Sequence, residues 1–321
     1  MGTKFTYDDI LLVPSRFESY NDDETNSIDY TMHLFGKKYI PIMSSPMDTI
    51  TGREMLLAMS NYGAVGVHHR YATKKELEDI FLLDIGGIAV SPSMGVDFIT
   101  EFYHKAYNIF CMLDVAHADT DRNINFCKDL IANGVDRLIA GSLVTDDAVL
   151  SYYKIGVNHF RVGVGNGSVC STRSVTGFGY PQGSAIFDLS TFRTNYDLDF
   201  KIIADGGINS TGDIIKAFVL GADFVMSGRL FAGAEETPIP GVYRGMASKE
   251  ALSTQKKDFF VEGEAINVPQ RTHVKDIILN VKEALIKGCY YGGVHSVKEL
   301  RNVKWNFISS GTFYENQVRR Y

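Results

Sequence analysis

The chain has little cysteine, and its cysteines are not arranged to bind metal or to cross-link a small fold. Its four cysteines, Cys111, Cys127, Cys170 and Cys289, are widely separated, and no two form a CxxC pair. This spacing argues against a zinc site and against a disulfide framework. We therefore expect a reducing compartment, and we assign the protein to the cytoplasm.

Long apolar runs and blocks of basic charge are also missing. The sequence has no apolar run of roughly eighteen residues, and its first residues lack the basic and apolar regions of a secretory signal. Its net charge is −6, which argues against duplex nucleic acid as a partner. We expect a soluble protein that binds small molecules, without a membrane or a nucleic acid as partner.

A glycine followed by a short apolar run recurs along the chain. Stretches such as NYGAVGVHH, NGVDRLIAGS and LGADFVMSG resemble a helix C-terminus that leads into a buried strand. Helical patterns lie between such stretches, at 145–153, at 210–220 with Asn209 as candidate N-cap, and at 273–285. Strand and helix therefore alternate.

About eight strands can be counted, including those near 41–47, 107–117 and 200–207, which predicts a (β/α)8 TIM barrel in a single domain over 1–321. A doubly wound open sheet is the alternative. Even spacing and the lack of a composition shift or linker favour the barrel. Residues 232–270 break the pattern and are expected to form a short flap after strand eight, and the tail, 302–321, is expected to be peripheral.

Two glycine-containing loops follow the last two predicted strands. In such barrels, phosphate commonly binds to the loops after strands seven and eight, which here are 205–210 and 227–230. Glycine lets backbone amides approach an anion, and the N-terminus of the following helix adds partial positive charge. Tight turns alone would also explain these glycines, but two such loops at successive strands favour a phosphate site.

Cys170 lies in a glycine-rich loop after strand six, GVGNGSVCSTRSVTGFGYPQ, on the same face of the barrel. Free backbone amides and the nearby Arg173 are surroundings that lower a thiol pKa, so Cys170 is a candidate nucleophile. The alternative is a small residue in a turn. The other three cysteines lie in strand-like or helix-like patterns, and we assign them to the interior.

Three carboxylates also follow predicted strands, namely Asp48, Asp114 and Asp205. A carboxylate at this face can accept hydrogen bonds from ribose hydroxyls or a base edge. It can equally cap the next helix, and for Asp48 and Asp114 both interpretations stay open.

Five motifs, in this order along the chain, resemble the IMP dehydrogenase and GMP reductase family. They are FTYDDILLVP (5–14), MSSPMDT (43–49), GNGSVCSTR (165–173), DGGI (205–208) and YRGMAS (243–248). The resemblance implies a barrel that binds a purine nucleotide monophosphate and attacks its C2 atom with Cys170. It also implies a homotetramer.

The resemblance is closest to GMP reductase, which uses NADPH to convert GMP into IMP and ammonia. Dehydrogenases of the family carry an Arg-Tyr pair on a long flap, and 249–261 is short and lacks that pair. Most of them also carry an inserted regulatory domain between two barrel strands, for which the strand spacing here leaves no room. In the reductases a threonine and a glutamate protonate the leaving amine, and Thr172 and Glu262 match them. IMP dehydrogenase acting with NAD, or a nucleotide-binding homologue without turnover, remain the alternatives.

The resemblance also implies roles for other residues. The phosphate would be held by Ser168, Gly207, Gly228 and Tyr243. The ribose would be bound by Asp205, and the rest of the nucleotide site would be lined by Ser45, Met47, Gly245, Met246 and Gly263. The nicotinamide cofactor would meet Asp114, Ala116 and His117. A monovalent cation such as K⁺ would be held by the backbone carbonyls of Gly165, Gly167 and Cys170.

The chain departs from the family pattern at two places. The lysine expected after strand two is His69, so its role passes to His69 or Arg70 or is lost. Arg229 replaces the second glycine of the pair after strand eight, where it adds a charged phosphate contact or crowds the site. In addition, MSSPM and YRGM are closer to dehydrogenase than to reductase sequences.

Overall fold

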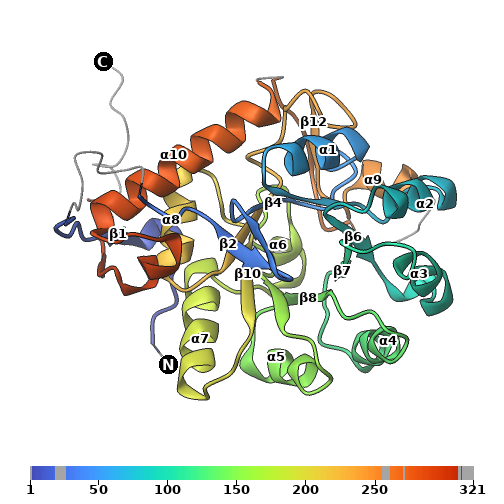
Figure 1. Ribbon diagram of the computed structural model, residues 1–321, viewed down its shortest axis with the longest axis horizontal. Helices are drawn as coiled ribbons and strands as arrows, with labels where there is room; N and C mark the ends of the chain where they lie inside the picture. The colour runs from blue at the N-terminus through green and yellow to red at the C-terminus, as the bar shows by residue number, and fades with distance from the viewer. Residues whose placement is uncertain (1, 19–26, 255–260, 270–271, 310–311, 313–321) are drawn as a thin grey trace.

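The structure of the chain is a computed structural model that describes residues 2–18, 27–254, 261–269, 272–309 and 312. Eight parallel strands close into a barrel in the order β10-β11-β4-β5-β6-β7-β8-β9 (Figure 1). The strands are β4 (Ile42–Ser44), β5 (Val65–His68), β6 (Gly87–Val90), β7 (Phe110–Leu113), β8 (Leu138–Leu143), β9 (His159–Val162), β10 (Lys201–Asp205) and β11 (Phe224–Ser227). The predicted (β/α)8 barrel is confirmed, and the open sheet is excluded.

The barrel strands are buried on both faces. Every residue of β5, β6, β7, β9 and β11 is buried, as expected for a parallel sheet with helices outside and packed side chains inside. Gly221, which precedes β11, shows why glycine recurs before the strands. Its φ is +110°, and a Cβ there would lie 2.0 Å from the Ser190 hydroxyl oxygen.

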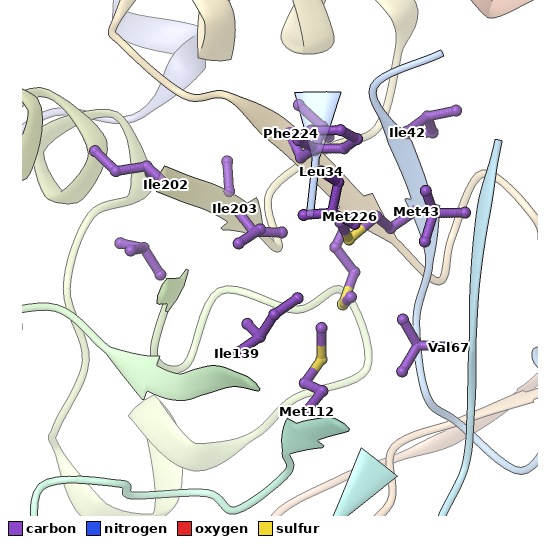
Figure 2. Packing of buried hydrophobic residues seen from close by; sticks show 14 of the residues in the cluster. Leu34, Ile42, Met43, Val67, Met112, Ile139, Ile202, Ile203, Phe224 and Met226 are labelled. Carbon is purple, nitrogen blue, oxygen red and sulfur yellow. The ribbon is translucent and has the colours of Figure 1, made fainter. Parts of the chain in front are cut away.

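Large apolar side chains fill the barrel interior. Figure 2 shows Met112, Ile139, Ile203 and Met226 directed toward one another from different strands. The hairpin β2 (Met32–Leu34) and β3 (Lys37–Tyr39) covers the end where the strands begin. At this end the Phe35 ring packs against the His159 ring, with 4.2 Å between their centroids. The hairpin therefore covers this end of the barrel interior, and the opposite end forms the mouth.

Eight helices that follow the barrel strands surround the barrel (Figure 1). They are α1 (Arg53–Asn61), α2 (Lys74–Leu83), α3 (Val96–Tyr103), α4 (Asp121–Ala132), α5 (Asp146–Tyr153), α7 (Gln182–Asn195), α8 (Thr211–Val219) and α10 (Val274–Gly292). The last of them, α10, packs against both α1 and α8 and completes the ring.

Two helix boundaries differ from the prediction. The N-cap of α8 is Ser210 rather than Asn209, because the Ser210 hydroxyl accepts from the Asp213 amide while the Asp213 carboxylate accepts from the Ser210 amide. Helix α10 continues past residue 285, because its first strong stop is Gly293, whose φ is +69°.

The segment between β11 and α10 lies at the barrel mouth. In it β12 (Val242–Arg244) pairs antiparallel with β13 (Ala265–Asn267), and α9 (Lys249–Thr254) lies between them in the sequence. The rest of the expected flap includes 255–260 and 270–271, which lie outside the described residues.

Short elements link the two ends of the chain. Strand β1 (Ile10–Leu12) pairs antiparallel with β14 (Trp305–Phe307), which belongs to the expected tail. Residues 310–311 and 313–321 of that tail lie outside the described part. The remaining elements are the helical turns η1 (Tyr7–Asp9), η2 (Pro92–Met94) and η3 (Val297–Asn302) and the short helix α6 (Thr172–Thr176). None of the helices in the described residues has the length and apolar character that a bilayer span requires.

Candidate active site

A cavity of about 660 Å³ opens at the carboxyl ends of the barrel strands. Most of the residues singled out from the sequence line it, namely Ser45, Met47, Asp114, Ala116, Gly165, Gly167, Ser168, Cys170, Thr172, Asp205, Gly207, Gly228, Arg229, Tyr243, Gly245, Met246 and Glu262. Two others do not form part of its wall. Gly263 lies directly behind Cys170 in a backbone bridge, and His117 is an exposed loop residue beyond Ala116.

The Cys170 thiol is the exposed end of a hydrogen-bonded series. Its sulfur lies 3.1 Å from the Thr172 hydroxyl, which in turn donates to the Glu262 carboxylate at 2.8 Å. A thiol, a hydroxyl and a carboxylate in series form a path along which a proton can move. Arg173, which lies near Cys170 in the sequence, donates instead to the carbonyl oxygen of Tyr180.

Backbone hydrogen bonds on both sides hold Glu262 beside the cysteine loop. Residues 262–264 bond to 169–171 on one side and to 245–247 on the other, with N–O distances of 2.9–3.1 Å. Gly263 permits this close approach, because a Cβ there would lie 3.0 Å from the Ser248 amide nitrogen. The distance between Glu262 and Thr172 is therefore set by a small sheet.

The predicted phosphate side of the cavity combines hydroxyls, glycine amides and one cation. The Ser168 hydroxyl lies 3.2 Å from that of Tyr243, and burial raises the pKa of the Tyr243 hydroxyl, which keeps it a neutral donor. Gly207 and Gly228 form the adjoining loops, with the N-terminus of α8 behind the first. The exposed side chain of Arg229 lines this side of the cavity, where its guanidinium can meet an anion.

Two carboxylates and two guanidiniums also form part of the wall. Asp114 accepts from Arg70 at 3.3 Å and from Arg161 at 3.0 Å, and Arg161 lies 3.7 Å from Asp205. Burial raises the pKa of Asp205, while the Arg161 guanidinium opposes that shift by favouring the carboxylate. Asp205 is thus the less tightly paired of the two acids and has acceptor capacity for ribose hydroxyls.

Arg161 was missed by the sequence reasoning, although the sequence contains a signal for it. It is an arginine within the fully buried strand β9, and a buried guanidinium is costly unless a carboxylate pairs with it. An arginine near the carboxyl end of a barrel strand therefore indicates an acidic partner at the mouth.

Neither of the two undecided aspartates caps a helix. The N-cap of α4 is Thr120, and that of α1 is Gly52, so Asp114 and Asp48 are free for other contacts. Asp114 lines the cavity in the charged cluster just described. Asp48 does not line it and instead accepts from Arg244 at 2.6 Å.

His69 and Arg70 differ in what they reach. The His69 ring stacks on the His68 ring and does not line the cavity. Burial lowers the pKa of His69 to about 4, so its imidazole is neutral near pH 7. Arg70 does line the cavity. Of His69 and Arg70, Arg70 is therefore the one at the cavity wall.

The three remaining cysteines are buried, as the sequence predicts. Burial raises the pKa of Cys111, Cys127 and Cys289 to about 12, which leaves each of them a thiol at neutral pH. Cys170 is the exposed cysteine of the four. A thiol-directed reagent acting on the folded protein therefore reports on Cys170.

Comparison with known proteins places this site in a family. The GMP reductase of Buchnera aphidicola subsp. Schizaphis graminum is 31% identical, with 92% of each chain covered. The inosine-5'-monophosphate dehydrogenases of Borreliella burgdorferi and Thermoplasma acidophilum are 29% and 27% identical, and the alignments cover 97% of this chain and 95% and 93% of theirs. These alignments extend over 325, 390 and 458 positions, respectively. The family model described as the IMP dehydrogenase / GMP reductase domain matches residues 4–80 and 87–319, and the chain belongs to that family.

Proposed function

We propose that the chain is a GMP reductase, which converts GMP to IMP and ammonia with NADPH as reductant. The hydrogen-bonded series Cys170–Thr172–Glu262 is the observation that carries the proposal. It places a nucleophile and a proton path together, and deamination at C2 needs both, because an amine is a poor leaving group unless it is protonated.

The reaction has two stages at Cys170. The thiolate adds to C2 of GMP and forms a carbon–sulfur bond, while the carbon–nitrogen bond breaks and the amine leaves as ammonia with a proton delivered through Thr172 and Glu262. Bound NADPH supplies the hydride that enters at C2. The carbon–sulfur bond then breaks, the thiolate is restored, and IMP is released.

Other residues of the chain hold the nucleotide across the barrel mouth. We assign the phosphate to Ser168, Gly207, Gly228, Arg229 and Tyr243, and the ribose hydroxyls to Asp205. The rest of the nucleotide site is assigned to Ser45, Met47, Gly245, Met246 and Gly263.

We assign the nicotinamide of the cofactor to the part of the wall formed by Asp114 and Ala116, which both line the cavity, and to His117, which does not line it. A monovalent cation is assigned to the carbonyls of Gly165, Gly167 and Cys170. The Gly167 carbonyl already accepts from the Cys170 amide at 3.0 Å and has a second lone pair to offer.

Two features favour the reductase over the dehydrogenase of the same family. The stretch KEALSTQKKDFFV, 249–261, offers no Arg-Tyr pair to activate water. The alignment with the reductase is also close to the chain's own length, whereas both dehydrogenase alignments are much longer. IMP dehydrogenase remains the second candidate, because MSSPM and YRGM, together with the two dehydrogenase relatives, favour it.

A direct assay separates these activities. Protein mixed with GMP and NADPH should consume the reduced cofactor and release one ammonia per cofactor oxidised. Turnover of IMP with NAD, without the GMP reaction, would assign the dehydrogenase instead. Tight GMP binding without turnover under either cofactor would indicate a binding protein.

A further inference from the structure

We propose that Asp48 and Arg244 form a positioning pair that aligns Glu262 with Thr172 and Cys170. The pair is almost enclosed, since the side chains are 12% and 11% exposed. Arg244 Nη2 donates to Asp48 Oδ2 at 2.6 Å and Nε to Oδ1 at 3.3 Å, so the contact is two-pronged and fixes the orientation of both groups.

The pair links two segments that are far apart in the sequence. Asp48 follows strand β4 of the closed barrel. Arg244 ends β12, in the segment between β11 and α10 (228–273), which we call the excursion. Two weaker contacts accompany the pair, from the Asp48 amide to the Met246 sulfur at 3.3 Å and from the Arg244 amide to the Thr49 hydroxyl at 3.4 Å. The excursion is thereby attached to the barrel beside the cavity.

The attachment continues from Arg244 to the reacting group through the backbone. The Gly245 amide donates to the Glu264 carbonyl at 2.9 Å, and the Glu262 amide donates to the Ala247 carbonyl at 3.0 Å. The Glu262 carbonyl in turn accepts from the Ser171 amide at 3.1 Å. A shift of Arg244 is therefore transmitted to both ends of the Thr172–Glu262 hydrogen bond.

The Asp48–Arg244 contact joins the excursion to the end of barrel strand β4. The β12–β13 pairing lies within the excursion and covers three residues on each strand, so it does not by itself fix Arg244 against the barrel. A displacement of about 1 Å in a catalytic contact can cost roughly 10²-fold in rate. Asp48 and Arg244 supply the side-chain contact that removes this freedom without touching the nucleotide.

The test compares single and double variants. Asp48→Asn should lower kcat with GMP and NADPH by about 10- to 100-fold, and Glu262→Gln should lower it as well. In the Asp48→Asn/Glu262→Gln protein, the Asp48 change should cost less than about twofold, because the residue it positions is already lost. If Asp48→Asn lowers kcat by the same factor in the wild-type protein and in the Glu262→Gln protein, the proposal is overturned.

A second readout does not depend on turnover. The rate at which iodoacetamide alkylates Cys170 is measured against pH, and Asp48→Asn should displace this profile in the same direction as Glu262→Gln. An undisplaced profile overturns the proposal. Although the kinetic arm rests on the proposed function, the alkylation arm does not, so a wild-type protein that is inactive with GMP would refute the function alone.

Two further variants guard against loss of folding. Arg244→Lys keeps the charge and removes the two-pronged contact, so it should displace the alkylation profile by a smaller amount in the same direction. Arg193→Lys is the control, because Arg193 lies 2.6 Å from Asp223 in a buried pair that does not line the cavity. It should lower the unfolding temperature and leave the profile unchanged. If Asp48→Asn does not fold, an unchanged profile in Arg244→Lys overturns the proposal.

Discussion

The hydroxyl of Thr172 donates a 2.8 Å hydrogen bond to the carboxylate of Glu262, although 90 residues separate them in the sequence. Thr172 also lies beside the thiol of Cys170, so the carboxylate and the nucleophile communicate through one hydroxyl. Cys170 and Glu262, the two ends of this series, both lie outside the helices and the barrel strands. Backbone pairing between the cysteine loop and 262–264 creates the series.

Replacing the nucleophile should abolish the reaction and spare binding. Cys170→Ala is expected to show no NADPH oxidation with GMP, because no other group is placed to form the bond to C2, while the dissociation constant for GMP changes little. The control is Cys289→Ala, which removes a buried thiol in α10 and should reduce stability but keep activity. Activity in Cys170→Ala near the wild-type level would exclude covalent catalysis.

Removing the acid at the end of the series should slow deamination specifically. Glu262→Gln is expected to lower the rate of ammonia release by roughly 10²- to 10⁴-fold, the usual effect of losing a positioned proton donor. Glu264→Gln changes the same group two residues further on, on an exposed side chain, and should have little effect. Equal rates in both variants would remove Glu262 from the mechanism.

The hydroxyl between thiol and carboxylate can be tested separately. Thr172→Val keeps the shape of the side chain but breaks the series, so it should reduce the rate about as much as Glu262→Gln. Thr172→Ser keeps the hydroxyl and should recover most of the activity. Equal activity of the valine and serine variants would mean that the hydroxyl carries no proton.

Arg229 is expected to strengthen binding of the nucleotide phosphate. Arg229→Met should raise KM for GMP by about tenfold, the effect of one charge-assisted hydrogen bond at an accessible site. Binding of guanosine, which lacks the phosphate, should be the same in both proteins. Arg53→Met removes a surface arginine of α1 as a control. An unchanged KM in Arg229→Met would contradict the phosphate assignment.

Stability should fall as the pH drops below about 6.5, because buried His159 resists protonation. Burial lowers the pKa of His159 from 6.5 to about 4, so between these values the unfolded chain binds a proton that the folded chain does not. The loss is about 1.4 kcal/mol per pH unit for each such histidine. Denaturant unfolding at several pH values measures this slope, and His159→Gln should flatten it, whereas the exposed His33→Gln should not. Equal slopes in all three proteins would contradict the burial argument.

The barrel could be predicted because its signals are local. Glycines such as Gly221 mark the approach to a buried strand, and the glycine-rich stretch around Cys170 indicated a loop, within which the structure forms the short helix α6. Thr172 and Glu262 were found only through the family resemblance. Local patterns do not show that 262–264 pairs with the cysteine loop.

Contacts across the barrel mouth could not be predicted in the same way. The sequence left Asp48 undecided between a cap and a ligand, whereas the structure pairs it with Arg244, 196 residues away. The pairing of Arg161 with Asp114 and Asp205 likewise depends on three strands closing into one barrel. Asn209 was a reasonable cap on composition, but the reciprocal bonds between Ser210 and Asp213 satisfy more of the free amides.

The most direct test of the account is a structure of the protein with GMP bound. We expect the phosphate at the loops of Gly207 and Gly228 and the Cys170 sulfur within about 3.5 Å of purine C2, or bonded to it. A purine whose C2 lies on the far side of the cavity, with the thiol turned away from the base, would contradict it.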